Sequence, residues 1–545
     1  MVRPFARDLM LSIALALVLG AVWTVRDWAQ LSVLSLPDTD DSMRLVQVRD
    51  WIGGQAWRDL TQHRLGAGAD GGLPMHWTRL GDLGPAALIV ALTPLIGTHA
   101  AETAAIVAWP ILLFAVALVL VGRIARAVDP ALAATATVVA ALAYPASTVF
   151  LPGRIDHHGL LLVLLLGAVL ATLGRASLTR GIVFGAAAAA SLVVGLETMP
   201  FLAVLGAAMI ARWALRPSDA APHRVRLIGV GIGALGGLIV ALGFAPAAFA
   251  YPACDGFTAQ AWRAAMILAC VPLVLPLMPV GTAGQRLGCA VALGAIAVAL
   301  ALIASPACLS PYGAVDARLK AAWLVHVSEA QPLFGAPVAA GIGYAGVLVV
   351  GLGATAWQAW RTRDFAWITI TVLLSASLVV ACVQLRGAYA GALLAAPGIA
   401  AMIAAARVRG TLALAGAWIG GAGIVYPAVA SRLFPAEAGP PAGTCLTPRL
   451  LDVLAALPVA EVLAPIDDGP SLLLHTRHRV LAAPYHRNAS GNLRAIALYA
   501  GRAAKPPPYG LSCPVVGNAL PVESHPIARD GDAMLWALSV APRAR

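Results

Sequence analysis

Three aspartates lie within four positions, at Asp38, Asp40 and Asp41, directly after the first long apolar segment of the chain. Carboxylates this close repel one another unless cations or hydrogen-bond donors compensate their charge. Beside a membrane surface, such a cluster can bind a divalent cation, for which carboxylate oxygens are suitable ligands. The structural alternative is a solvated acidic turn that caps the next helix through Asp40 or Ser42.

A second polar cluster runs from Arg154 to His158 at the start of a later apolar segment. Asp156 and His158 form an Asp-x-His pair, which can offer one oxygen and one nitrogen to the same cation. The structural alternative is an N-cap aspartate followed by two histidines, His157 and His158, at the membrane interface.

Two further polar sites interrupt the apolar sequence. His326 and Glu329 lie in the longest loop between two late apolar segments, and Arg386 stands between two apolar runs. A glutamate can hydrogen-bond or deprotonate an incoming nucleophile, and an arginine can bind a phosphate through two parallel hydrogen bonds. An ordinary surface acid and an arginine that snorkels to the membrane surface are the structural alternatives.

The composition is that of a polytopic membrane protein. Of the 545 residues, 60% are hydrophobic and only 12% are charged, and the mean hydropathy is +0.82. The net charge of +11 is expected to reflect basic residues in cytoplasmic loops, so it does not indicate a nucleic-acid partner.

The apolar segments predict thirteen membrane-spanning helices. These segments cover residues 9–25, 103–121, 131–149, 159–173, 181–196, 199–213, 227–249, 264–280, 287–305, 337–358, 365–381, 388–406 and 411–430. The shorter run Pro85 to Gly97 predicts a re-entrant or interfacial helix. With the N-terminus inside, every inner loop of this arrangement is basic, as the positive-inside rule requires.

This topology places the four polar sites on the outer face of the membrane. Residues 1–430 then form the membrane domain, with large outer loops at 26–102 and 306–336, and residues 431–545 form a small outer α/β domain. In that domain, the apolar runs Val453 to Val462 and Ser471 to Leu474 predict a helix and then a strand.

Four of the seven cysteines also lie on the outer face. Cys254 and Cys308 flank a pair of predicted spans, and Cys445 and Cys513 bracket the C-terminal region. Two disulfides in an oxidising compartment are therefore expected, in a pairing that the sequence leaves open.

Taken together, these sites resemble the catalytic subunit of oligosaccharyltransferases, a GT-C-type family of membrane glycosyltransferases that use polyprenyl-linked donors. Asp40 resembles the catalytic and metal-binding aspartate of the family's first loop. Asp156 and His158 resemble its second-loop motif in the Asp-x-His form. Glu329, within Val-Ser-Glu, resembles the glutamate of the family's Ser-Val-Ser-Glu loop, and Arg386 falls where the family has an arginine on a late span.

The resemblance implies a metal-dependent glycosyltransferase. Asp40, Glu329 and Arg386 would be catalytic, and Asp40, Asp156 and His158 would hold a divalent ion, Mg²⁺ or Mn²⁺. The residues expected to contact the substrates are Asp38, Arg154, His157, His326, Asp467, Asp468 and His486.

The C-terminal domain departs from the family pattern. Oligosaccharyltransferases carry a Trp-Trp-Asp-Tyr-Gly motif that binds the acceptor sequon, whereas this chain has Pro-Ile-Asp-Asp-Gly-Pro at 465–470. An acceptor other than a standard Asn sequon is therefore expected. The sequence leaves open whether the acceptor is a protein, a lipid or a polysaccharide, and whether the glycan donor is a polyprenyl mono- or pyrophosphate.

The expected location is the inner membrane of a bacterium, with the lipid bilayer around the spans and with the active site and the C-terminal domain in the periplasm. A transporter or flippase for a lipid-linked or small polar substrate is the main alternative, with Glu197 as its candidate acid. Transporters, however, place such charges near the bilayer midplane, whereas Glu197 lies near a span end. An assembly subunit with an inactive site is a third alternative, against which the retained acids and Arg386 argue.

Overall fold

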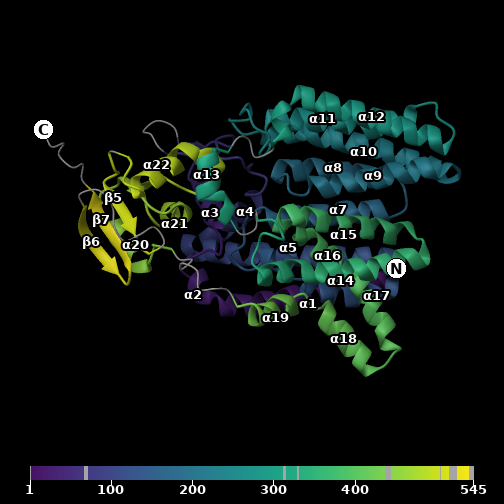
Figure 1. Ribbon diagram of the computed structural model, residues 1–545, viewed down its shortest axis with the longest axis horizontal. Helices are drawn as coiled ribbons and strands as arrows, with labels where there is room; N and C mark the ends of the chain where they lie inside the picture. The colour runs from purple at the N-terminus through teal and green to yellow at the C-terminus, as the bar shows by residue number, and fades with distance from the viewer. Residues whose placement is uncertain are drawn as a thin grey trace.

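A bundle of long helices makes up most of the molecule, and a smaller mixed region with a β-sheet lies at one end of it (Figure 1). This computed structural model describes residues 2–66, 72–310, 315–327, 331–435, 444–503, 505–514 and 524–538. The bundle helices run along the long axis of the molecule.

The bundle consists of apolar helices joined by short connections. They are α1 (Val2–Arg26), α5 (Thr98–Val128), α6 (Ala133–Ala141), α7 (His158–Leu173), α8 (Leu178–Val194), α9 (Met199–Leu215), α10 (Ala220–Ala241), α11 (Ala259–Val274), α12 (Ala283–Ala304), α14 (Val338–Thr362), α15 (Phe365–Val383), α16 (Ala388–Leu394), α17 (Ala396–Arg407), α18 (Thr411–Gly421) and α19 (Val425–Leu433).

Each of the thirteen predicted spans contains a helix, but not every helix has the length of a span. In the described residues, seven helices are long and apolar enough to cross a membrane, and the bent pairs α16–α17 (49°) and α18–α19 (82°) bring the number to nine. The other four predicted spans correspond to the shorter helices α6 to α9. The chain is thus a multi-pass membrane protein, and the number thirteen stays a prediction.

Small residues explain the closest helix contact of the bundle, which joins α8 and α10. Gly181 and Gly185 on α8 face Gly229 and Gly233 on α10. A Cβ atom at Gly229 would lie 2.3 Å from the carbonyl oxygen of Leu178, so no larger residue fits there without a shift of the backbone. Glycines four residues apart let two helices approach at backbone distance in a membrane, where apolar burial does not drive helix association.

The segment between α1 and α5, which the sequence predicts as an outer loop, is called the first outer segment. It begins with α2 (Trp28–Leu31) and α3 (Thr39–Ile52) and contains the short antiparallel pair β1 (Thr61–Gln62) and β2 (Leu73–Pro74). It ends with α4 (Leu83–Ile96), the helix predicted as re-entrant or interfacial. With 14 residues, α4 is about 21 Å long, shorter than the roughly 30 Å hydrocarbon core of a bilayer.

The C-terminal region contains a five-stranded sheet in the order β4-β3-β5-β7-β6. Its strands are β3 (Glu461–Leu463), β4 (Arg479–Val480), β5 (Tyr509–Ser512), β6 (Ser524–Asp530) and β7 (Ala533–Leu538), and its helices are α20 (Pro448–Ala456), α21 (Gly469–His475) and α22 (Ala489–Tyr499). β3 runs parallel to β4 and β5, whereas β7 is antiparallel to both of its neighbours.

The prediction of a strand at Ser471 to Leu474 was wrong, because these residues belong to α21. Pro470 lies in the first turn of this helix, where its fixed φ angle and missing N–H favour helix initiation. The predicted helix Val453 to Val462 was also wrong in extent, because α20 ends at Ala456 and β3 begins at Glu461.

The C-terminal region packs on α3 through a common hydrophobic core. Met43 and Val46 of α3 belong to the same buried cluster as Leu472 and Val480. Two arginines add polar contacts, because Arg49 donates to the carbonyl of Leu474 and Arg64 to those of Leu473 and Thr476. These bonds satisfy carbonyls at the end of α21 that the helix leaves without partners. The helix that carries Asp40 is thereby held against the C-terminal region.

Two disulfides join segments that are distant in the sequence. One links Cys254, in the connection between α10 and α11, to Cys308. The other links Cys445 to Cys513 and so ties the segment before α20 to the end of β5. α13 (Ala317–Ala322) packs against α22 at the same end of the molecule (Figure 1).

Candidate active site

Arg154 gathers three carboxylates from the first two outer segments. Its guanidinium lies 2.8 Å from Asp38 Oδ2, 3.4 Å from Asp41 Oδ2 and 2.5 Å from Asp156 Oδ2. These four residues are called the Arg154 cluster. One positive charge faces three carboxyl groups, so the cluster retains an excess of negative charge.

Backbone hydrogen bonds fix the geometry of this cluster. Asp38 caps α3 by accepting the Asp40 N–H at 3.1 Å. Asp41 is fully buried and accepts the N–H groups of Ile155 and Asp156, each at 2.8 Å. Asp41 therefore holds the second outer loop against the start of α3 and places Asp156 beside the first loop.

The carboxyl groups of the cluster differ in acidity. Burial raises the pKa of Asp41 well above its ordinary value, although the charge of Arg154 acts to lower it. Burial also acts on Asp156, but the charges of Arg154 and His158 outweigh it and hold the pKa of Asp156 well below the usual range. Burial alone would raise the pKa of Asp38, but the charge of Arg154 outweighs it, so the pKa of Asp38 is lowered.

Next to the cluster lies a small cavity of about 110 Å³ between the bundle and the C-terminal region. Five of the predicted site residues line it, namely Asp40, His157, His158, Arg386 and His486. Its other polar residues are His76, Glu197 and Asp255, which the motif analysis did not assign to the site. Segments more than four hundred residues apart in the chain, such as those of Asp40 and His486, meet at this cavity.

Glu197, between α8 and α9, lies at the centre of the polar contacts in this cavity. Its Oε1 atom is 3.1 Å from His157 Nε2 and 3.9 Å from Arg386 Nη1. Burial alone would raise the pKa of the Glu197 carboxyl. The charges of His157 and Arg386 outweigh the effect of burial, so this pKa lies below the usual range. Arg386 is further held by a hydrogen bond from its Nε to Gln384 at 3.0 Å.

The residues predicted to hold a metal fit this role only in part. His158 does, because one ligand atom each of His157, His158 and Glu197 lie within 4.8 Å of one another. Asp156 is already engaged, since Oδ1 accepts the His158 main-chain N–H at 3.0 Å and Oδ2 contacts Arg154 and His158 Nδ1. Asp40 lines the cavity. The predicted set of Asp40, Asp156 and His158 stays a prediction.

Asp255 forms a second ion cluster at the cavity, together with His486 and Arg487. Arg487 binds Asp255 through Nε and Nη2, each at 2.7 Å, and His486 Nε2 lies 2.7 Å from Asp255 Oδ2. These contacts overcome the effect of burial and hold the pKa of Asp255 below its usual range. These three residues are called the Asp255 cluster.

Arg487 also connects the C-terminal region to the first outer segment, because its Nη1 donates to the carbonyls of Pro74 and Met75 at 3.1 and 3.2 Å. The adjacent His76 lines the cavity, and its ring contacts the ring of His486 at a centroid distance of 5.3 Å. Burial, and then the charges of His486 and Arg487, hold the pKa of His76 well below its ordinary value. Neither His76 nor Asp255 belongs to a sequence motif, so only their placement identifies them.

The two aspartates predicted to bind substrate in the C-terminal region do not line this cavity. Asp468 is buried and accepts hydrogen bonds from the Thr444 hydroxyl and from the Cys445 N–H. Burial raises the pKa of Asp468 to about 6. Asp467 is exposed, and a role for it as a substrate contact stays a prediction. Glu329 and the side chain of His326 lie outside the described residues.

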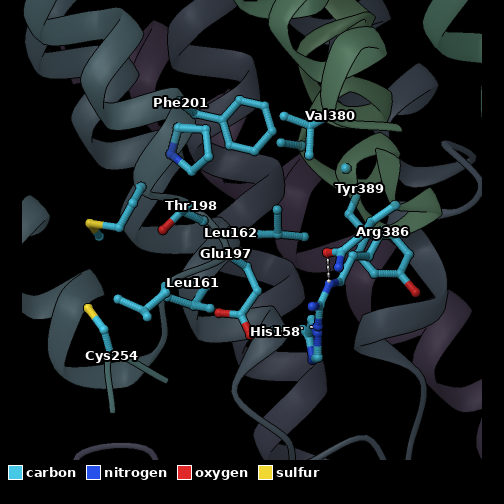
Figure 2. Close-up of a pocket in the computed structure, with 16 residues that line it drawn as sticks. His158, Leu161, Leu162, Glu197, Thr198, Phe201, Cys254, Val380, Arg386 and Tyr389 are labelled. Carbon is cyan, nitrogen blue, oxygen red and sulfur yellow. Dashed lines mark hydrogen bonds and ion pairs between the residues drawn. The ribbon is translucent and has the colours of Figure 1, made fainter. Parts of the chain in front are cut away.

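A second cavity, of about 350 Å³, has mostly apolar walls and one polar end. Figure 2 shows Leu162, Phe201 and Val380 around its apolar part. His158, Glu197 and Arg386 lie on the side where it meets the small cavity, and all three line both cavities. A long apolar group with a charged head fits such a lining.

No protein-family model and no curated protein matches the chain, but solved structures do. Archaeal oligosaccharyltransferase AglB from Archaeoglobus fulgidus, solved with an inhibitory peptide and a dolichol-phosphate, matches with a TM-score of 0.62 and 12% identity over 92% of this chain and 69% of that chain. The same enzyme tethered to an acceptor peptide with the NVT sequon matches with a TM-score of 0.58 and 12% identity, over the same shares.

Its complex with zinc and sulfate matches with a TM-score of 0.52 and 14% identity over 86% of this chain and 62% of that chain. At such low identity the similarity establishes the fold and leaves the activity open. The GT-C-like architecture predicted from the motifs is thereby confirmed. The chain is a multi-pass membrane protein with the fold of the oligosaccharyltransferases.

Proposed function

We propose that the protein is a membrane glycosyltransferase that transfers a glycan from a polyprenyl-phosphate- or pyrophosphate-linked donor. One observation carries this proposal: the apolar cavity and the small polar cavity have His158, Glu197 and Arg386 in common. A lipid-linked donor needs this arrangement, because its polyprenyl chain requires apolar walls and its phosphate requires cationic groups where the chain ends.

In this proposal, the first isoprene units of the donor lie along Leu162, Phe201 and Val380. The phosphate then reaches Arg386, whose position is fixed by Gln384 and by the carboxylate of Glu197. The guanidinium can donate two parallel hydrogen bonds to phosphate oxygens. The glycan extends into the small cavity towards Asp40.

The reaction breaks the bond between the anomeric carbon and the phosphate oxygen, and the electron pair leaves with the phosphate. A nitrogen or oxygen of the acceptor forms the new bond to the anomeric carbon and gives its proton to the Asp40 carboxylate. Arg386 stabilises the negative charge that develops on the leaving group. A divalent cation at the same end of the cavity would supply further positive charge there. Glu329 remains the second proposed catalytic group.

The acceptor proposed here differs from a standard Asn sequon. The stretch 465–470 lacks both tryptophans of the sequon-binding motif, and its Asp468 supports the segment around Cys445. Among the other predicted substrate contacts, His157 and His486 line the cavity, whereas Asp38 and Arg154 belong to the adjacent cluster. A protein, lipid or polysaccharide acceptor is compatible with this arrangement.

We place the active site and the C-terminal region in the periplasm of a bacterium, with the bundle in the inner membrane. The basic residues of the predicted inner loops support this orientation. Both disulfides lie at the outer end, and disulfides persist in oxidising compartments such as the periplasm.

Membranes that contain the protein and a radiolabelled polyprenyl-linked glycan test the proposal. Wild type should move the label from the lipid to a product whose chemistry identifies the acceptor. Asp40→Asn and Arg386→Gln should each reduce this transfer by about 100- to 1,000-fold, because each removes one group that stabilises the transition state.

His63→Asn is the matched control, since His63 is exposed and pairs with Asp59 at the protein surface. It should transfer the label at the wild-type rate. If wild type consumes no donor across mono- and pyrophosphate-linked glycans, or if Asp40→Asn is as active as wild type, the proposed reaction is wrong.

A further inference from the structure

We infer that the protein binds the phosphate headgroup of an anionic phospholipid at the end of the helix bundle that lies away from the two cavities. The residues of this site are Arg180, Arg212, His223 and Arg226, which are called the Arg226 cluster. The inference goes beyond the proposed function, since none of these residues belongs to the candidate active site.

The cluster lies where four helices of the bundle end. α7 and α9 begin beside the apolar cavity, at His158 and Met199, and both run away from it. α8 and α10 begin where α7 and α9 end, so the connections 174–177 and 216–219 lie at the far end of these helices (Figure 1). In a multi-pass membrane protein, such helix ends leave the hydrocarbon core and meet the lipid headgroups.

Two arginines of the cluster converge on the end of α7. Arg180 Nη1 donates to the carbonyl of Leu170 at 3.0 Å, and Arg226 Nη1 donates to that of Thr172 at 2.8 Å. These carbonyls belong to the last turn of the helix, where cations are favoured by the helix dipole. The partial negative charge of a helix end offsets only part of two guanidinium charges, so this end of the bundle keeps an excess of positive charge.

The contacts of His223 show that an acceptor is missing from the cluster. Arg212 Nε lies 3.1 Å from His223 Nε2, and Arg226 Nη2 lies 3.1 Å from His223 Nδ1. A neutral imidazole has one N–H and one lone pair, so it can accept from only one of the two guanidinium groups, and a protonated imidazole can accept from neither. Asp219, 3.4 Å from His223 Nε2, is the carboxylate that the described residues place here, and it is 52% exposed. A bound anion would supply the acceptor that the second guanidinium lacks.

Arg226 provides an independent observation. Its side chain is 1% exposed, and its Nε is buried without a hydrogen-bond partner among the described residues. Buried donors of this kind almost always have a partner, and one that lacks it calls for an explanation such as an unseen ligand. An anion between Arg226 and Arg212 accounts both for this donor and for the two guanidinium groups on one histidine ring.

The surroundings favour a phospholipid as the source of the anion. Leu178, Leu215 and Val225, which are close to the cluster in the sequence, are large apolar side chains that are 41%, 58% and 44% exposed. Such side chains suit contact with acyl chains, whereas basic pockets between helices at the membrane surface suit lipid phosphates. The Arg212 guanidinium lies over the ring of Phe365 at 4.3 Å. Stacking leaves the edge of a guanidinium available, and this edge matches the geometry of phosphate oxygens.

The test measures binding of soluble dioctanoyl phosphatidylglycerol to the full-length protein, purified in detergent and freed of lipid, by native mass spectrometry. Wild type should bind one such molecule roughly tenfold more tightly than dioctanoyl phosphatidylcholine, because the choline cation is repelled by the cluster. Arg212→Gln and Arg226→Gln should each lower the affinity for phosphatidylglycerol by roughly tenfold, because each removes a charge-assisted hydrogen bond to the phosphate.

Further variants separate a lost phosphate contact from a damaged fold. Arg226 also supports the end of α7, so a damaged fold is a second explanation for an effect of Arg226→Gln. Arg212 is only half-buried, and Arg212→Gln tests the site without that complication. Arg212→Lys keeps the charge and should stay within roughly threefold of wild type. Arg409→Gln is the matched control, since Arg409 is exposed in another basic connection of the bundle, and it should bind like wild type.

Three results would overturn the inference. The first is equal affinity of wild type for phosphatidylglycerol and phosphatidylcholine, and the second is wild-type affinity in Arg212→Gln. The third is displacement of phosphatidylglycerol by an equal concentration of inorganic phosphate, which would mean that the cluster takes a free anion and not a lipid. Because lipid binding needs no glycan donor, these results are independent of whether the protein transfers a glycan.

Discussion

The two ion clusters at the small cavity compensate their charges to different degrees. In the Arg154 cluster, three carboxyl groups face one guanidinium, whereas in the Asp255 cluster one carboxylate contacts both Arg487 and His486. Burial raises the pKa of Asp41, because the charge of Arg154 does not outweigh burial there. The pKa of Asp255 is lowered, because Arg487 and His486 outweigh burial. The first cluster can therefore stabilise a cationic ligand nearby, whereas the second is neutralised within the protein.

Removal of the shared guanidinium should have the largest effect on this comparison. Arg154→Gln leaves Asp38, Asp41 and Asp156 facing one another without a cation, and Asp41 and Asp156 are buried. Loss of one partner of a buried ion pair typically costs about 3–5 kcal/mol. We expect a loss of this size in the free energy of unfolding, measured by denaturant titration in detergent.

Arg318→Gln is the matched control, because Arg318 is 77% exposed and pairs with Asp316 on the surface. Its effect should stay within about 0.5 kcal/mol, as for other surface substitutions. An equally small effect of Arg154→Gln would mean that the three carboxylates do not depend on Arg154.

The buried carboxyl of Asp468 has no cationic partner among the described residues and shows the effect of burial alone. Its donors are the Thr444 hydroxyl and a main-chain N–H, and burial raises its pKa to about 6. The folded protein then binds this proton more tightly than the unfolded chain, whose aspartate has a pKa of about 3.9. The contribution to stability is complete below about pH 4 and is lost as the pH rises through about 6, by up to about 3 kcal/mol.

Asp468→Asn should remove this decline, which a comparison of unfolding free energies at acidic and neutral pH would reveal.

Asp255→Asn should change the pH dependence in the opposite sense. The lowered pKa of Asp255 contributes stability above the unfolded pKa, and this is lost as the pH falls through the folded one. Asp452→Asn, on the exposed face of α20, should leave the pH dependence as in wild type. Equal pH profiles for all three variants would contradict the assignment.

A smaller effect should follow from Arg487→Lys. Lysine keeps a positive charge near Asp255 but loses the parallel pair of hydrogen bonds, and it cannot also reach the carbonyls of Pro74 and Met75. We expect a loss of about 1–2 kcal/mol in the free energy of unfolding.

Arg529→Lys in β6 is the control, since the Arg529 side chain donates to the nearby Gly531 carbonyl at the surface. It should unfold like wild type. A loss above about 3 kcal/mol for Arg487→Lys would instead indicate that the parallel hydrogen bonds, more than the positive charge, stabilise the Asp255 carboxylate.

Much of the site was predictable because its residues stand in short motifs. Asp38 is the N-cap of α3, Asp40 and Asp41 lie in its first turn, and Asp156 and His158 lie two residues apart at the start of α7. The predicted topology assigned these residues to one outer face, and the structure brings Asp40, His158, Arg386 and His486 to one cavity. Glu197 was noticed only as a possible transporter acid, because a single glutamate near a span end carries no motif.

The sequence by itself determined that the chain is a helical membrane protein, and it predicted that the unusual polar residues lie on one face. Apolar runs, basic loops and helix caps are local properties, so they can be recognised without knowledge of the fold. The partners of each charge were decided only by the tertiary structure. Arg154 meets Asp38 across 116 residues, and Arg487 meets Asp255 across 232 residues. Burial and charge partners set the pKa of a carboxyl, and both depend on segments that are distant in the chain.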